Sequence, residues 1–320
     1  MRGAFFKSLA VLLALSAPAA AQEFPAKPLR LIIPFAPGGS VDIVARLAAQ
    51  KLGDRLGKQV LPENRSGAGG VIGLELAIAA PPDGHTLVLV SLAHAVTPHI
   101  NKLPFDAAKA LSFVASLGNG PSVLTVHPSV QANSVKELVA LAKAKPGTLH
   151  FAHAGVGSFT HTASVLFSMM AGIDTVMVPF KGGGPAMIDV LGGHSQLLMN
   201  SYLASLPHVR SGKLRALGVS DTRRSPLLPD VPTIDESGVP GYQAANWWGI
   251  AVPSGTPQPI VERLNKEINA FLTSDEVKQT FDKQGATPVP MSVAEFKKFY
   301  DDELIKWGKV VKAADIKSAN

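Results

Sequence analysis

The sequence predicts an α/β protein whose sheet is mainly parallel. Short apolar runs alternate along the chain with segments in which apolar residues recur at helical spacing, as expected of strands connected through helices. The chain also has 29 glycines and 25 prolines among its 320 residues. This content indicates many tight connections between short elements rather than a bundle of long helices.

The elements of the first half are predicted from buried runs and helix-stopping residues. Residues 28–34 form an apolar run that predicts a strand, and 40–56 carry an apolar stripe that ends at Gly57, which predicts a helix. The turn PPDG at 81–84 precedes a buried strand at 86–90. The other elements expected here are a strand at 59–61, a helix at 71–80 and, after an irregular stretch, a strand at 122–126.

The second half continues the same alternation. A Pro-Gly pair ends a predicted helix at 135–144, and proline opens another at 185–191, a position where it is favoured. An extended arm at 242–252 carries Trp247 and Trp248, which point to opposite faces of a strand. Either one is core and the other faces a cleft, or both are core, and we expect both in the core. The other elements expected are strands at 148–152, 175–179, 196–199 and 214–219 and helices at 159–170, 257–272, 274–284 and 293–313.

The N-terminus has the features of a secretory signal peptide. Arg2 and Lys7 precede an apolar run, and small residues in an A-x-A pattern follow as far as Ala21. This apolar stretch is too short for a bilayer, which needs about 20 residues. Cleavage after Ala21 is expected to leave residues 22–320 in the periplasm and to lower the net charge from +6 to +4, because Arg2 and Lys7 are removed.

Composition and missing motifs exclude several classes of protein. With 46% apolar and 17% charged residues the chain is not disordered, and without cysteine it has no disulfides, thiolate metal sites or thiol catalysis. The basic residues are scattered with few aromatics among them, so nucleic-acid binding is not expected. No P-loop, complete dinucleotide fingerprint or G-x-S-x-G elbow occurs. We therefore expect no cofactor.

Four glycine-rich turns carry the functional signal: PFAPGGS at 34–40, GAGGVIG at 67–73, AGVGS at 154–158 and KGGG at 181–184. Each is expected between a strand and a helix, where the first backbone N–H groups of the helix are unpaired and its dipole is positive. Glycine lets an anion approach these donors closely. One such turn alone is more simply a tight connection, but four that converge at one edge of a sheet predict a pocket for a carboxylate or another anion.

Two side chains near these turns have both a functional and a structural interpretation. Ser158 and His161 are spaced like a nucleophile and a base, but Ser158 is better explained as the cap of the helix that follows. Asp42 either contacts ligand or pairs with Arg46 one helical turn later. We expect no catalytic residue.

The histidines do not form a metal site in the predicted structure. His150 and His153 face opposite sides of a strand, and His94 and His99 are expected in a loop without a third ligand. No metal is therefore expected.

The chain resembles the Bug-type solute receptors, the extracytoplasmic binding proteins of tripartite tricarboxylate transporters. The motifs that carry the resemblance follow one another over essentially the whole mature chain: PFAPGGSVDIVAR at 34–46, ENRSGAGG at 63–70, PDGHTL at 82–87, VPFKGGGPA at 178–186, LPDVPT at 228–233 and WGIAVPSGTP at 248–257. The resemblance implies a type II periplasmic binding protein fold, in which two α/β lobes are joined by two crossing strands with the ligand cleft between them. Residues 22–121 and 226–320 would form lobe 1, and 122–225 lobe 2.

The resemblance also implies which residues contact the ligand. In that family the ligands are mostly small carboxylates, held largely by backbone amides of loops and by waters. Lobe 1 would contribute Phe35, Gly38, Gly39, Ser40 and Asp42, with Ser91 and His94 from the next strand-end loop. Lobe 2 would contribute Ala154, Gly155, Gly157, Ser158, His161, Lys181, Gly182, Gly183 and Asn200.

Three positions depart from the family pattern, which often has Asn, Glu and Asp where this chain has Thr97, Val165 and Asn200. The loss of an acid near lobe 2 would favour a more anionic ligand. We therefore expect a monomeric periplasmic receptor that captures a di-, tri- or aromatic carboxylate by lobe closure and delivers it to membrane permease subunits. The same module serving as the sensory partner of a signalling protein is the alternative. A secreted hydrolase is a third, weaker hypothesis, because the sequence shows no set of nucleophile, base and orienting residue.

Overall fold

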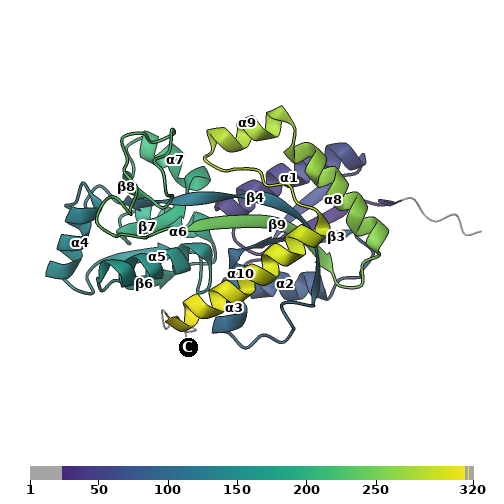
Figure 1. Cartoon of the computed structure of the whole chain (residues 1–320), viewed down its shortest axis with the longest axis horizontal. Helices are drawn as coiled ribbons and strands as arrows, with labels where there is room; N and C mark the ends of the chain where they lie inside the picture. Colours follow the sequence, from purple (N-terminus) through teal and green to yellow (C-terminus); the bar gives the residue numbers. More distant parts are fainter. Residues whose placement is uncertain (1–23, 314–315, 317–320) are drawn as a thin grey trace, which may run out of the picture.

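The computed structural model describes residues 24–313 and 316, and these form two lobes around one continuous sheet (Figure 1). The strands are β1 (Leu29–Ile33), β2 (Val60–Asn64), β3 (Thr86–Ser91), β4 (Leu111–Val126), β5 (His150–His153), β6 (Val176–Pro179), β7 (Leu197–Ser201), β8 (Arg215–Val219) and β9 (Ala245–Pro253). The helices are α1 (Ser40–Leu56), α2 (Val71–Ile78), α3 (Leu92–Ile100), α4 (Val135–Ala144), α5 (Phe159–Ala171), α6 (Gly183–Leu191), α7 (Tyr202–Arg210), α8 (Gln258–Leu272), α9 (Asp275–Lys283) and α10 (Val293–Ala313), with a short 3₁₀ turn at Ala68–Gly70.

The predicted signal peptide at 1–21 lies outside the described residues. Of the helices that the structure describes, none is long and apolar enough to cross a membrane.

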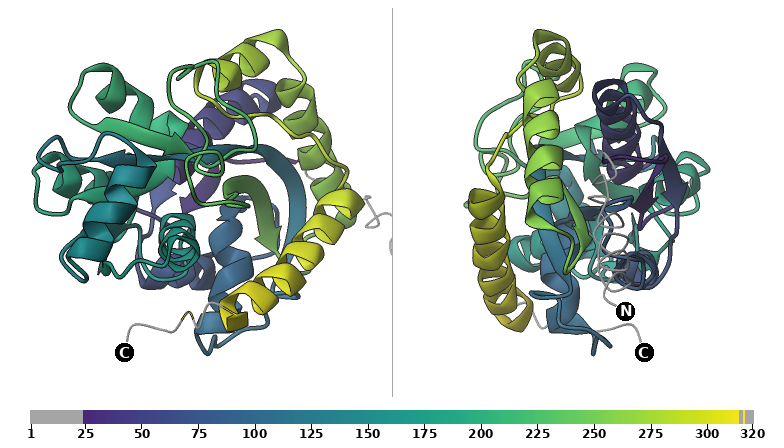
Figure 2. Two further views of the ribbon diagram at one scale, coloured as in Figure 1. Left: turned by 60° about the vertical axis from the view of Figure 1, so that its left-hand side comes forward. Right: turned by 90° about the vertical axis from the view of Figure 1, so that its right-hand side faces the viewer.

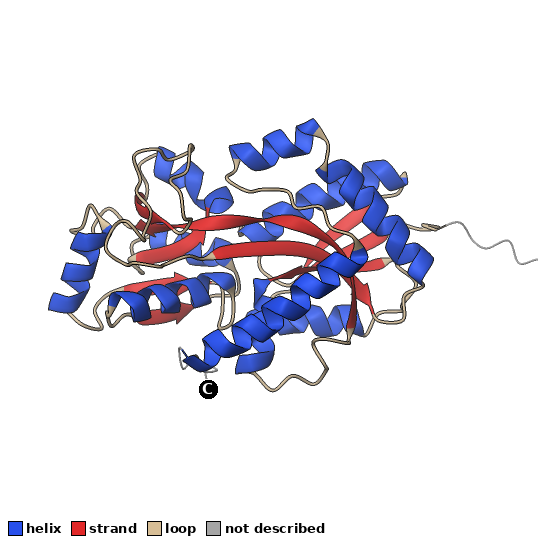
Figure 3. Cartoon of the chain, viewed as in Figure 1, coloured by secondary structure: helices blue, strands red, loops and turns tan. Residues whose placement is uncertain are grey.

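The sheet has the order β2-β1-β3-β9-β4-β7-β5-β6, with β8 beside β4. Lobe 1 contains β1–β3 with α1–α3 and α8–α10, and lobe 2 contains β5–β8 with α4–α7 (Figures 1 and 3). Within each lobe β1 and β5 pair with their neighbours in parallel, as the alternation of strands and helices predicts. The pairs that involve β4 and β9 are antiparallel, so the sheet is mixed rather than mainly parallel.

The two strands β4 and β9 cross from one lobe to the other and confirm the periplasmic binding protein architecture. They pair with each other from Leu111↔Pro253 to Pro121↔Ala245, and β4 then continues into pairs with β7 and β8. Only 122–126 was predicted as strand here, because serines, an asparagine and glycines interrupt the apolar pattern before it. Gly118 has a φ of +149°, and a Cβ there would overlap the carbonyl oxygen of Thr287, so packing requires glycine in mid-strand.

Two helices, α3 and α7, lie where no helix was predicted. Each carries a proline, Pro98 or Pro207, which lowers helix propensity in any sequence-based reading. Each begins directly after a strand, which ends at Ser91 before α3 and at Ser201 before α7. The prediction that His94 and His99 lie in a loop is therefore wrong, because both are on α3.

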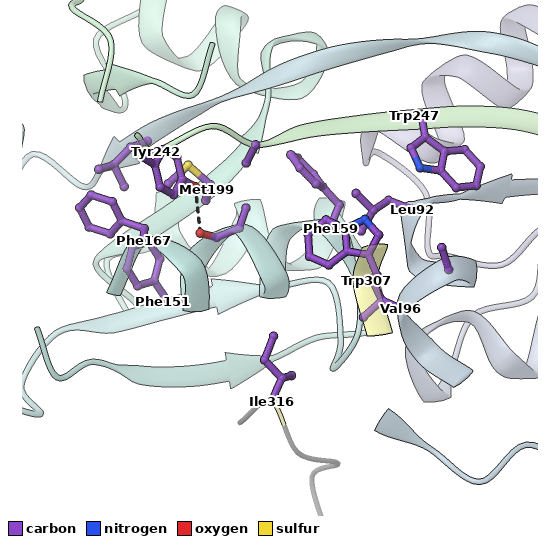
Figure 4. Close-up of a cluster of buried hydrophobic side chains, with 14 of the residues drawn as sticks. Leu92, Val96, Phe151, Phe159, Phe167, Met199, Tyr242, Trp247, Trp307 and Ile316 are labelled. Atoms are coloured by element: carbon purple, nitrogen blue, oxygen red, sulfur yellow. Dashed lines mark hydrogen bonds between the residues drawn. The ribbon is translucent and has the colours of Figure 1, made fainter. Parts of the chain in front are cut away.

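One apolar core runs through both lobes beneath the crossing strands. Trp247 belongs to it together with Leu92 of lobe 1 and Phe167 of lobe 2, as Figure 4 shows. Trp248, on the opposite face of β9, belongs to a second cluster that includes α1 and α8. Both tryptophans are buried, at 4% and 0% exposure, which confirms the prediction that both are core.

The C-terminal helix and the segment before β9 cover this core from two sides. The helix α10 lies beside α3 and along β4 (Figure 2). Its Glu303 accepts hydrogen bonds of 3.0 Å from the indole N–H groups of both Trp247 and Trp307. The segment before β9, which the sequence division at 226 assigns to lobe 1, packs on lobe 2, where the Tyr242 hydroxyl donates to the Ala163 carbonyl (Figure 4).

Candidate functional site

The N-termini of four helices converge on a small cavity of about 30 Å³ between the lobes. Its walls come from the starts of α1 and α3 in lobe 1 and of α5 and α6 in lobe 2, together with one residue each from β7 and β9. The residues that line it are Phe35, Gly39, Ser40, Val41, Ser91, Ala154, Ser158, Phe159, Thr160, Gly183, Asn200 and Asn246. We call it the inner cavity. Because a helix N-terminus carries unpaired N–H donors and a partial positive charge, this convergence favours an anion.

Asp42 holds the lobe 1 turn at 34–39 from behind. Its carboxylate accepts hydrogen bonds from Gly38 N (3.0 Å), Arg46 Nε (2.9 Å) and Asn64 Nδ2 (2.9 Å). Burial by itself raises the pKa of Asp42, but these three donors outweigh it and hold that pKa below its usual value. The predicted pair with Arg46 is confirmed, and the side chain stands outside the residues that line the cavity.

The lobe 2 turn at 154–158 uses most of its own backbone donors internally. Ala154 N donates to Thr160 Oγ1 (2.7 Å), Gly155 N to His153 Nδ1 (3.2 Å) and Gly157 N to His161 Nδ1 (3.3 Å). Ser158 Oγ accepts from His161 N at 3.2 Å, which confirms that Ser158 caps α5. Ser158 N donates to Gly155 O as well, so the donors left for a ligand in lobe 2 lie mainly at the helix starts rather than in the turn itself.

Asn200 places a fixed donor in the inner cavity. Its Oδ1 accepts a 2.9 Å hydrogen bond from Ser201 N, which determines the orientation of the amide. The residue is 1% exposed, and its Nδ2 has no hydrogen-bond partner among the residues that the structure describes. An unpaired buried donor is costly, so this amide has the property expected of a ligand contact.

Asn246 is a lining residue that the sequence reading missed. It lies on β9, one of the two crossing strands, and is 1% exposed with an Oδ1 that lacks a partner among the described residues. The available signal was a buried-strand pattern interrupted by one amide immediately before the two tryptophans. Val41, Phe159 and Thr160 were also missed, because they follow the turns by one or two residues.

The glycines of the turns let the backbones of the two lobes touch. Ala36 N of lobe 1 donates a 3.0 Å hydrogen bond to Lys181 O of lobe 2. A Cβ on Gly182 would lie 2.7 Å from Ala36 N, and one on Gly184 would overlap the carbonyl oxygen of Pro37. Close approach between lobes is thus a second reason for glycine here, beside access to an anion.

An outer cleft of about 520 Å³ adjoins the inner cavity. Phe35 and Ala154 line both spaces, and residues 67–70 of the second glycine-rich turn line the outer one. Lys181 and Lys102 also line the outer cleft. A ligand with one carboxylate in the inner cavity would extend past Phe35 toward these cations.

The structure separates the predicted contact residues into three groups. The inner cavity takes Phe35, Gly39, Ser40, Ser91, Ala154, Ser158, Gly183 and Asn200. The outer cleft takes Gly155 and Lys181, besides Phe35 and Ala154. The remaining predicted residues line neither of these two spaces: Gly38, Asp42, His94, Gly157, His161 and Gly182.

His94 supports the start of α3 instead of facing the inner cavity. Its Nδ1 accepts a 2.7 Å hydrogen bond from Ser91 N in a capping box. Its ring lines a separate apolar cavity of about 10 Å³, and burial lowers its pKa to about 4. Among residues 24–313 and 316, no three histidine or acidic side chains converge to hold a metal ion.

Comparisons with families, with related sequences and with solved structures each find a match over most of the chain. The family described as "Tripartite tricarboxylate transporter family receptor" matches residues 44–316. Protein BugT of Bordetella pertussis is 38% identical over 306 residues, which cover 95% of this chain and 94% of BugT. A solved R. palustris protein with adipate is 32% identical with a TM-score of 0.89, covering 92% of this chain and 100% of its own. MatC from Rhodopseudomonas palustris with bound malate is 31% identical with a TM-score of 0.86, covering 90% and 100%.

Proposed function

Because the chain belongs to the tripartite tricarboxylate transporter receptor family, we propose that it captures a small organic carboxylate between its lobes and delivers it to a membrane permease. The family consists of extracytoplasmic solute-binding receptors, and the proposed role needs no catalysis. Residues 1–21 would direct the chain to the periplasm, where such a receptor meets its ligand.

The convergence of four helix N-termini on the inner cavity carries the proposal. At a partly buried site each N-terminus stabilises an anion by up to about 2 kcal/mol. Four of them would supply up to about 8 kcal/mol, from which the costs of association are subtracted to give the net binding free energy. The fixed Nδ2 donor of Asn200 adds a hydrogen bond to the same anion.

Capture would proceed by closure of the lobes. In the open form the N-termini of α1 and α3 are separated from those of α5 and α6, and a carboxylate enters between them. Closure then brings the turn at 34–39 onto the turn at 181–184, as in the contact between Ala36 and Lys181. The ligand drives this movement only through its greater affinity for the closed form, in which all four N-termini face it.

A thermal-shift panel on residues 22–320 tests the binding step. The protein is unfolded and refolded to remove any guest, and malate, adipate, citrate and benzoate are compared with their uncharged amides. An acid at 100 times its Kd is expected to stabilise the fold by about 2.7 kcal/mol, and the amide is expected to have no effect. Equal shifts with acids and amides would contradict a carboxylate receptor, and no shift with any of the four acids would exclude these acids as its ligands.

Asn200→Asp tests the charge preference of the inner cavity. The new carboxylate should weaken binding of a dianion such as malate much more than that of a monoanion, if the absence of an acid here selects for more anionic ligands. Asn133→Asp, an exposed site in lobe 2, adds the same charge away from the cavity and serves as the matched control. An equal response of both ligands would remove this preference from the proposal.

Delivery is tested separately from binding. Deletion of the gene should abolish uptake of the acid identified in the panel, and the gene restored with the signal peptide should recover it. Unchanged uptake together with tight binding would instead favour the role of sensory partner.

A further inference from the structure

Two buried imidazole rings lie against the lobe 2 turn at 154–158. His153 is the last residue of β5 and His161 is in the first turn of α5, so the two flank the turn. Their ring centroids are 4.5 Å apart, and the residues are 1% and 6% exposed. A pair of polar rings at this depth needs hydrogen-bond partners, and the turn provides them.

Each ring accepts one backbone N–H from the turn. His153 Nδ1 accepts from Gly155 N at 3.2 Å, and His161 Nδ1 accepts from Gly157 N at 3.3 Å. Both glycines have left-handed backbones, with φ of +112° and +82°. An imidazole nitrogen accepts a hydrogen bond only when it carries no proton, so both rings must be neutral with the proton on Nε2.

We infer that His153 and His161 are positioning residues of the ligand site, whose neutral rings hold the lobe 2 turn in its binding shape. This turn places Ala154 and Ser158 on the wall of the inner cavity. It also fixes the start of α5, where Phe159 and Thr160 line the same cavity. The sequence resemblance implied a direct ligand contact for His161, whereas its ring acts here through the backbone of the turn.

The surroundings of the pair keep both rings neutral. Burial disfavours the charged form of each ring, and a proton on His161 repels one on His153. The pKa of His153 is lowered to about 3 and that of His161 to about 4. Both acceptors are therefore available throughout the neutral pH range.

Amide hydrogen exchange on the ligand-free protein tests the brace without reference to any ligand. His153→Leu and His161→Leu remove the acceptors, while the corresponding Asn variants keep an acceptor oxygen near the place of Nδ1. We expect exchange at the glycine partner to rise about tenfold or more in each Leu variant and to stay within about threefold of wild type in each Asn variant. His150→Asn, at the other end of β5, is the matched control. Unchanged exchange in the Leu variants would overturn the inference.

Side-chain ¹⁵N spectra of the unmodified protein give an independent test, should the Leu variants fail to fold. Both rings are expected to show an unprotonated Nδ1 and a protonated Nε2 at pH 7. A proton on either Nδ1 would refute the brace.

Binding of malate and adipate tests the consequence for the site, and this part alone rests on the proposed function. We expect the Leu variants to bind about tenfold more weakly than wild type and the Asn variants to restore affinity to within about threefold. Full affinity in a Leu variant that has lost the amide protection would refute the positioning role. If wild type binds neither probe, the carboxylate proposal fails for these acids, while amide exchange and ring protonation still decide the brace.

Discussion

Substitution of Gly184 by alanine is expected to raise the stability of the ligand-free protein and to lower its affinity for ligand. It is the second residue of α6, and its φ lies outside the left-handed region, so the backbone accepts alanine without strain. A Cβ there would overlap the Pro37 carbonyl oxygen and lie 3.0 Å from the Pro37 carbonyl carbon, across the gap between the lobes. Gly184→Ala therefore obstructs the closed arrangement and leaves each lobe intact.

The two effects have opposite signs and can be estimated. In the open form alanine improves the helix by up to about 1 kcal/mol, which raises the Tm of a chain of this size by about 2 °C. In the closed form the overlap costs about 1–3 kcal/mol, as for overpacked cores, unless the lobes stay apart. If ligand is held in the closed form, as proposed, its Kd should increase roughly 5- to 150-fold.

The assay combines calorimetric titration of the acid identified in the panel with thermal unfolding without ligand. Gly192→Ala at the other end of α6 is the matched control, because it is exposed and its Cβ would meet only residues of lobe 2. We expect Gly192→Ala to keep the wild-type Kd. A Gly184→Ala protein with unchanged Kd would refute the reasoning, because the contact between the turns would then not belong to the liganded state.

Three further predictions concern buried polar groups. Glu303→Leu leaves two buried indole N–H groups without an acceptor and should lower the free energy of unfolding in urea by about 2–5 kcal/mol. Glu303→Gln keeps an acceptor oxygen and should lower it less. Equal losses in the two variants would show that the hydrogen bonds from the two indoles do not stabilise the fold. His94, His153 and His161 have folded-state pKa values of about 4, 3 and 4 against 6.5 unfolded. Below pH 6.5 the unfolded chain therefore binds more protons, and stability that is complete above pH 6.5 should fall by roughly 3 kcal/mol per ring by pH 4; a flat urea midpoint across this range would refute the burial of neutral rings. Asp42→Ala releases three donors and should cost about 2–4 kcal/mol and weaken ligand binding, measured by urea unfolding and titration; loss of stability with unchanged affinity would show that the lobe 1 turn keeps its shape without this carboxylate.

Local sequence was sufficient for most of the fold. Apolar runs and helical spacing predict the strands of each lobe and most helices, because burial on one face of an element depends mainly on the spacing of its own residues. The helices α3 and α7 were not predicted because proline disfavours a helix locally, although tertiary packing stabilises both helices and a capping box at Ser91 stabilises α3. The first half of β4 was not predicted because its glycines are required by close contacts with residues distant in the chain, such as the contact of Gly118 with the carbonyl of Thr287.

For the site, the sequence by itself determined that glycine-rich turns lie at the starts of several helices and that their exposed donors suit an anion. Tertiary structure alone decided which of those donors are free. In the turn at 154–158 two backbone N–H groups are taken by His153 and His161, while Asn200 and Asn246 contribute polar groups from strands. The physical reason is that a backbone donor has one partner at a time, and that partner is chosen by packing between elements distant in the chain.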